Sequence, residues 1–147
     1  MRRAAFALVT ILVLAGCGGG GGGERLTRAE FASKADAICG KYNQQTKALE
    51  NPTNLSDLAK VADKTIPILD NALKDLRKLK PPEDEQAKVD QWLQQVENLK
   101  GDLTEIRDKA DDNDMQGVQA VVPKADQHNT RANELATQLG MHVCNSD

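Results

Sequence analysis

The feature that most constrains the fold is a long run of apolar residues that recur at alternating steps of three and four. Steps of this kind place the side chains along one face of an α-helix. No polar residue interrupts the series, which comprises Val89, Trp92, Val96, Leu99, Leu103, Ile106 and Ala110. Such a face is buried only when other helices pack against it, so the pattern predicts a helical bundle.

Three further segments have helical periodicity. The first opens with Thr27 and Glu30, which match a capping box in which each side chain binds a free backbone amide of the other residue, and it extends to about residue 50. Apolar residues at helical spacing then cover residues 55–80 and, after an acidic turn, residues 115–139. The sequence therefore predicts four helices.

Pro67 and Pro123 lie inside the second and fourth predicted helices, and we expect them to interrupt these helices because proline lacks a backbone donor. Gly140 is placed to end the fourth helix in a left-handed cap. The connections are short, and no strand-like alternation competes with the helical pattern. The expected fold class is all-α, an antiparallel up-down four-helix bundle that occupies residues 24–147.

The N-terminus has the organisation of a bacterial secretory signal. Residues 1–3 are cationic, and the apolar residues 4–14 are too few to span a bilayer as a helix. The sequence then reads LAGC at residues 14–17, which matches a lipobox. We expect residues 1–16 to be a lipoprotein signal peptide and Cys17 to be the lipidation site, with acyl chains such as palmitate. The alternative is a plain signal peptide followed by an incidental cysteine.

Residues 17–23 contain this cysteine and six consecutive glycines, which form a flexible tether in front of the helical domain. Two acyl chains on Cys17 would be enough for stable anchoring. We therefore expect the protein to be lipid-anchored at the extracytoplasmic face of the cell membrane, with membrane lipid as a partner. The net charge of −3 disfavours nucleic acid as a partner.

Cys39 and Cys144 remain as a pair in a chain that is exported to a compartment where disulfides form. We expect them to be bonded, and the bond would stabilise the fold by about 4–5 kcal/mol on the chain-entropy model. Free thiols are the alternative. A catalytic pair with His128 or His142 is less favoured, because no neighbouring residues indicate an activated thiolate.

Several motifs occur in a characteristic order along the chain. After the lipobox and glycines come LTRAEF at 26–31, ADAIC at 35–39, LKPP at 79–82, WL at 92–93 and LGMHVC at 139–144. This order resembles a group of small exported helical proteins and lipoproteins from actinobacteria. The resemblance implies a disulfide-tied helical domain outside the cytoplasmic membrane, and it brings no catalytic residues with it.

Signatures of catalysis and of metal binding are missing. The serines of the mature chain lie outside hydrolase motifs. A calcium loop that starts at Asp112 would place Pro123 where a bidentate glutamate is required. A weak cation site in the acidic turn at residues 111–114 is less favoured than a turn in which Asp114 caps the next helix. We expect no enzyme activity, no metal site and no cofactor.

Aromatic residues argue against a stacking surface for sugars or bases. Phe31, Tyr42 and Trp92 all lie on faces that we expect to be buried. Gln45 and Asn129 interrupt apolar faces and could line a polar pocket, although a mutual hydrogen bond or exposure to solvent is favoured.

Two main functions remain. The first is a non-enzymatic protein-interaction module at the cell envelope, with an envelope or membrane protein as its partner. The second is a small-ligand carrier with a pocket between kinked helices. An exposed apolar patch would favour the module, whereas an internal apolar void would favour the carrier. The continuous apolar face of the third helix favours the module. A self-associating structural lipoprotein is a further alternative, and the sequence leaves the ligand-binding residues unknown.

Overall fold

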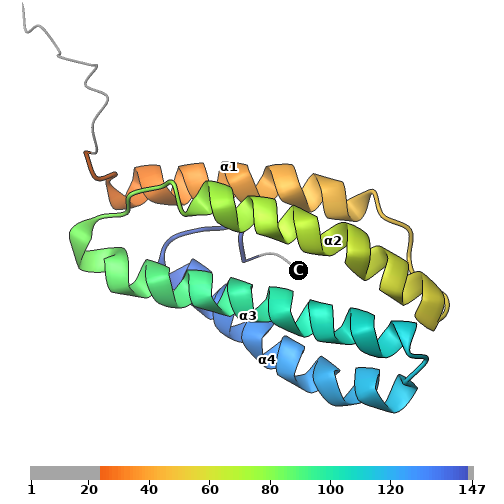
Figure 1. The fold of residues 1–147 in the computed structure, drawn as a ribbon. Coiled ribbons are helices and arrows are strands. Elements are labelled where there is room, and N and C mark those ends of the chain that lie inside the picture. Colours follow the sequence, from red (N-terminus) through yellow and green to blue (C-terminus); the bar gives the residue numbers. More distant parts are fainter. Residues whose placement is uncertain (1–23, 146–147) are drawn as a thin grey trace, which may run out of the picture.

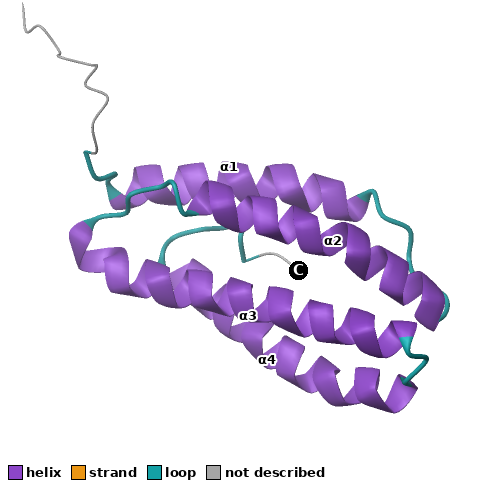
Figure 2. Ribbon diagram, in the orientation of Figure 1, coloured by secondary structure: helices purple, strands orange, loops and turns teal. Residues whose placement is uncertain are grey.

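The computed structural model describes residues 24–145, and these residues form helices without any strand (Figures 1 and 2). The helices are α1 (Arg28–Lys47), α2 (Leu55–Leu76), α3 (Gln86–Asp111) and α4 (Met115–Gln138), with a short 3₁₀ turn, η1 (Glu83–Glu85), before α3. The expected all-α class is confirmed. The predicted signal peptide, Cys17 and the glycine tether lie outside the described residues. No helix within residues 24–145 is both long enough and apolar enough to cross a membrane.

Local sequence explains several helix ends. At the start of α1, the backbone N–H of Thr27 donates to Oε2 of Glu30 over 2.9 Å, and the backbone N–H of Glu30 donates to Oγ1 of Thr27. At the start of α4, Asp114 accepts a hydrogen bond from the backbone N–H of Gly117 over 2.8 Å. After α4, Gly140 has a φ of 80°, in the left-handed region that favours glycine. All three capping predictions are confirmed.

Both internal prolines lie within helices that continue across them. α2 is unbroken through Pro67, and α4 is unbroken through Pro123. The predicted interruptions are therefore not confirmed. Both prolines are exposed, so the carbonyl groups that they leave without an intrahelical donor, those of Asp63 and Gln119, can be hydrated at the helix surface.

Two hydrophobic clusters form the core. The smaller cluster is built around Ala59 of α2, Ala110 of α3 and Val118 of α4, and α1 contributes nothing to it. The larger cluster combines all four helices with the residues that follow α4. It contains Phe31, Ala32, Ala35, Leu76, Val89, Trp92, Ala132, Leu135, Ala136, Leu139 and Met141. The burial predicted for Phe31, Tyr42 and Trp92 is confirmed.

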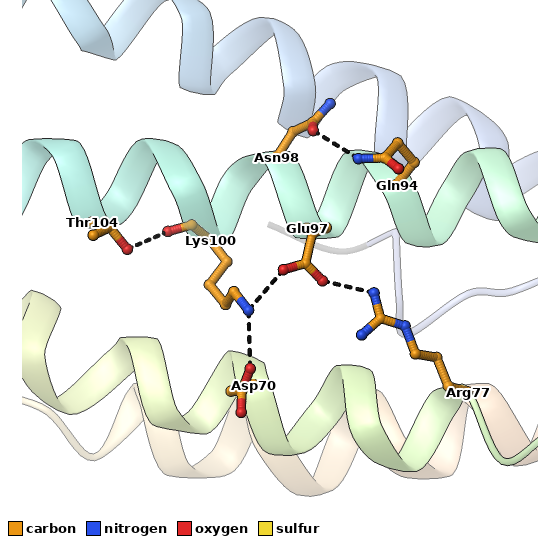
Figure 3. A network of polar contacts seen from close by, with 7 residues as sticks. All are labelled: Asp70, Arg77, Gln94, Glu97, Asn98, Lys100 and Thr104. Atoms are coloured by element: carbon orange, nitrogen blue, oxygen red, sulfur yellow. Dashed lines mark hydrogen bonds and ion pairs between the residues drawn. The ribbon is translucent and has the colours of Figure 1, made fainter.

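Polar contacts join α2 to α3 along the side of the bundle (Figure 3). Nζ of Lys100 lies 2.9 Å from Oδ1 of Asp70 and 2.7 Å from Oε1 of Glu97. Arg77 Nη2 lies 2.7 Å from the other carboxylate oxygen of Glu97. The hydrogen bonds from Lys100 and Arg77 lower the pKa of Glu97 below its ordinary value. Exposed ion pairs stabilise only modestly, so we expect this network to contribute little to the free energy of unfolding.

Candidate functional site

A disulfide joins α1 to the segment that follows α4. Sγ of Cys39 and Sγ of Cys144 are 2.07 Å apart, and the two Cα atoms are separated by 5.3 Å. The predicted pairing is confirmed. The bond connects residues that are 105 positions apart, and it holds Cys144, which follows α4, against the middle of α1.

The side chain of Asp36 binds backbone groups of the same segment. The carboxylate accepts hydrogen bonds from three consecutive N–H groups, those of His142 at 2.9 Å, Val143 at 2.8 Å and Cys144 at 3.1 Å. Hydrogen bonds to an ionised acceptor are stronger than those between neutral groups. The C-terminal segment, which we define as residues 141–145, is thus tied to α1 by a covalent bond and by one carboxylate.

A cleft of about 180 Å³ opens next to the disulfide. All four helices and the C-terminal segment contribute to its walls, and none of the lining residues is charged. The apolar and sulfur-containing walls are Cys39, Ile68, Leu69, Ala72, Leu76, Trp92, Val96, Leu99, Ala132, Val143 and Cys144; the polar groups come from Tyr42, Asn43, Thr46, Asn129 and Asn133. The chemistry of the cleft suits an uncharged and largely apolar molecule.

Trp92 is the largest side chain in this wall. It is only 1% exposed, and its Nε1 has no hydrogen-bond partner among the described residues. Buried tryptophan N–H groups usually have a partner. Because the chain contains a single tryptophan, its fluorescence reports on the cleft.

Four other hollows on the described surface differ from this cleft, because each has charged side chains in its walls. The largest measures about 540 Å³, lies between α3 and α4, and is lined by polar residues such as Asn98, His128, Arg131 and Glu134. A charged and hydrated surface of this kind does not favour an apolar ligand.

Asp102 of α3 is a buried carboxylate that the sequence analysis did not identify. It is 1% exposed, its Oδ2 lies 2.5 Å from Nδ1 of His128, and its Oδ1 lies 3.0 Å from Nζ of Lys124. Burial by itself would raise the pKa of Asp102. The hydrogen bonds from His128 and Lys124 together have the larger, opposite effect, so the pKa lies below its ordinary value. The sequence signal for this contact was the four-residue spacing of Lys124 and His128, which places both side chains on one face of α4.

The remaining candidates from the sequence have separate positions. Asp114 caps α4, as predicted for the acidic turn, and residues 24–145 contain no group of three or more histidine, cysteine or acidic side chains that could hold a metal ion. Gln45 is exposed, whereas Asn129 lines the cleft. The side chain of His142 is exposed, and only its backbone N–H binds Asp36.

Comparison with known proteins found no family model, no curated protein and no solved structure that matches this chain. The resemblance to actinobacterial lipoproteins remains an expectation from sequence motifs, and lipidation of Cys17 remains a prediction. The described residues define a disulfide-tied, four-helix domain with an uncharged cleft between its helices.

Proposed function

We propose that this protein is a lipid-anchored, extracytoplasmic and non-enzymatic carrier of a small, uncharged, apolar molecule. The observation that carries the proposal is the cleft beside the disulfide, whose walls come from all four helices and contain no charged residue. Small-molecule sites are typically concave and apolar, with a few polar groups that orient the ligand. Asn43, Thr46 and Asn129 are polar groups of this kind.

The size of the cleft limits the ligand. Its volume is about 180 Å³, and an apolar cavity of about 150 Å³ is large enough to bind benzene. We therefore infer that the bound part of the ligand is a single ring, a short branched aliphatic group, or the end of a longer chain. Ions and nucleotides are poor candidates because no charged side chain could balance their charge.

The carrier proposal includes an antiparallel up-down arrangement of the bundle. Support comes from the short connections between successive helices. In Figure 1, the links from α1 to α2 and from α3 to α4 are drawn at one end of the bundle, and the link from α2 to α3 at the other. In this arrangement parts of all four helices line one cleft.

An interaction module has weaker support. Such a module needs an exposed apolar patch of several hundred Å². Within residues 24–145, the large hydrophobic side chains in exposed positions are Met115, Val122 and Val143, which are 51%, 49% and 37% exposed. Two of them lie in the first half of α4, and the third belongs to the wall of the cleft. An envelope or membrane protein would find little apolar surface here.

Ligand binding is tested by titrating purified protein with toluene and following the fluorescence of Trp92. We expect a saturable change with toluene and none with benzoate, whose ring is similar in size but charged. The variant Leu69→Phe adds volume to the wall and should weaken the response. Its matched control is Leu58→Phe, because Leu58 is also a partly buried leucine of α2 but packs against the smaller cluster. A wild-type protein without a saturable response would contradict the proposal.

The anchor is tested separately in cells. The six glycines after Cys17 would let the domain reach away from the lipid surface. We expect Cys17→Ser to move the protein from the membrane fraction to the soluble fraction. Unchanged membrane association would show that acylation of this cysteine is not what holds the protein at the membrane.

A further inference from the structure

We propose that the C-terminal segment is a redox-controlled wall of the cleft, and that reduction of the Cys39–Cys144 bond by a dithiol releases the bound ligand. The inference rests on the proposed carrier function and adds to it a means of regulation. It starts from the position of the disulfide, since both cysteines and Val143 line the cleft.

The attachments of the C-terminal segment differ in strength along its length. Met141 is fully buried in the larger cluster, so the start of the segment is held by packing. Residues 142–145 are exposed or only partly buried. Besides the disulfide, their contacts include hydrogen bonds to the carboxylate of Asp36 and a long hydrogen bond of 3.5 Å from Nδ2 of Asn43 to the carbonyl of Val143, both on the side of α1. On the side of α4, Nδ2 of Asn145 donates to Oγ1 of Thr137 over 3.0 Å.

Loss of the covalent bond therefore makes it less favourable for residues 142–145 to stay ordered against α1. Ordering a segment costs conformational entropy, and in the disulfide form the bond fixes the far end of residues 142–144. In the dithiol form, only non-covalent contacts, among them the hydrogen bonds to Asp36 and from Asn145 to Thr137, oppose that entropy. Most of these hydrogen bonds are exposed to water, which competes for the same donors and acceptors, so each contributes only modestly to holding the segment. Movement of Val143 and Cys144 away from the helices would open one side of the cleft.

The chemical step is thiol–disulfide exchange. One thiolate of the reducing dithiol attacks a sulfur of the Cys39–Cys144 bond, that bond breaks, and a mixed disulfide forms. The second thiol of the reductant then displaces the protein sulfur. The products are the thiols of Cys39 and Cys144 and the oxidised, cyclic disulfide of the reductant, which has supplied two electrons and two protons. Both cysteines are partly exposed, so an external dithiol can approach them.

The experiment uses the Cys17→Ser protein, in which Cys39 and Cys144 are the only cysteines. Toluene affinity is measured by Trp92 fluorescence before and after treatment with dithiothreitol, with the free thiols counted and the helix content followed by circular dichroism. We expect reduction to weaken binding by at least about tenfold with the helix content retained, and reoxidation to restore it. If the oxidised protein does not bind toluene, the carrier function itself is wrong.

A second variant keeps the test decisive if reduction also unfolds helices. Asp36→Asn leaves the disulfide intact but removes the ionised acceptor of three backbone hydrogen bonds, so affinity should fall by about threefold. Asp57→Asn is the matched control, since Asp57 lies in the first turn of α2 and outside the cleft. The redox proposal is wrong if the reduced, helical protein binds as tightly as the oxidised form. It is equally wrong if Asp36→Asn binds like Asp57→Asn.

Discussion

Asp36 and Asp102 are acidic residues inside helices, yet they stabilise the protein in different environments. The carboxylate of Asp36 is partly exposed and binds backbone N–H groups of the C-terminal segment. The carboxylate of Asp102 is buried and binds two side chains of the neighbouring helix. In both cases the partners are distant in sequence. From the sequence alone, each aspartate therefore cannot be distinguished from an ordinary acidic residue on an exposed helix face.

Stability at acid pH is expected to depend on Asp102. Its pKa in the folded protein is lowered, the hydrogen bonds from His128 and Lys124 outweighing burial. A carboxyl group with a depressed pKa stabilises the fold above its unfolded pKa of about 3.9, and this stabilisation is lost as the pH falls further. We therefore expect the urea midpoint, measured by circular dichroism, to decrease steeply below about pH 4.

The variant Asp102→Asn isolates this contribution. At pH 7 it should be less stable than wild type. As the pH falls below about 4 the difference should shrink progressively, because the carboxyl is protonated first in the unfolded wild-type chain and, at still lower pH, in the folded protein as well. Asp75 retains an acid-sensitive contribution in both proteins, since hydrogen bonds from Lys78 and Tyr42 lower its pKa to about 2. A stability difference that stays constant from pH 7 to pH 3 would disprove the role assigned to Asp102.

At the scale of secondary structure elements, Pro67 costs α2 one intrahelical hydrogen bond even though the helix continues across it. We expect Pro67→Ala to stabilise the protein by about 1–3 kcal/mol, because alanine restores an N–H donor to the carbonyl of Asp63 and has the highest helix propensity. The free energy of unfolding in urea provides the measurement. The control is Pro52→Ala, since Pro52 lies in the connection before α2. Equal or lower stability of Pro67→Ala would indicate that the proline geometry is needed for packing.

Periodicity and capping motifs were sufficient to predict the four helices, because these signals are local. The predicted ends of the first and second helices, near residues 50 and 80, extend past the observed ends at Lys47 and Leu76. Apolar residues continue beyond both ends, and Leu79 packs against the larger cluster from a turn. Periodicity alone cannot distinguish a buried turn residue from a helical one. The effect of the prolines was overestimated, because their exposure on the surface could not be deduced from spacing.

The candidate site was predictable only in part. The cysteine count and the export signal were enough to pair Cys39 with Cys144, and Asn129 was identified as a possible pocket residue. The cleft itself was not predictable, because it depends on how side chains of four helices fill the space between them. Ile68 and Val96, for example, both belong to apolar faces, and nothing local indicates that they border a gap.

At the scale of the whole molecule, the disulfide is expected to contribute a large part of the stability. Cys39→Ser and Cys144→Ser should each lower the free energy of unfolding by up to about 4–5 kcal/mol, because the unfolded chain loses a constraint on a very long loop. The double variant should lower it by the same amount as either single variant, since all three lose one shared bond. Thermal and urea unfolding measure the effect. Additive losses would mean that the cysteines contribute independently.

The unequal sizes of the two hydrophobic clusters have a consequence for native-state hydrogen exchange. The larger cluster is held by four helices and the disulfide, whereas the smaller one is held by α2, α3 and α4 alone. Amide protons near Ala59 and Val118 should therefore exchange through local openings, while those near Trp92 and Leu135 should wait for global unfolding. Ile68 and Leu69 lie between the two regions along α2, so we expect opening of the weaker end to loosen the cleft from the side opposite the disulfide.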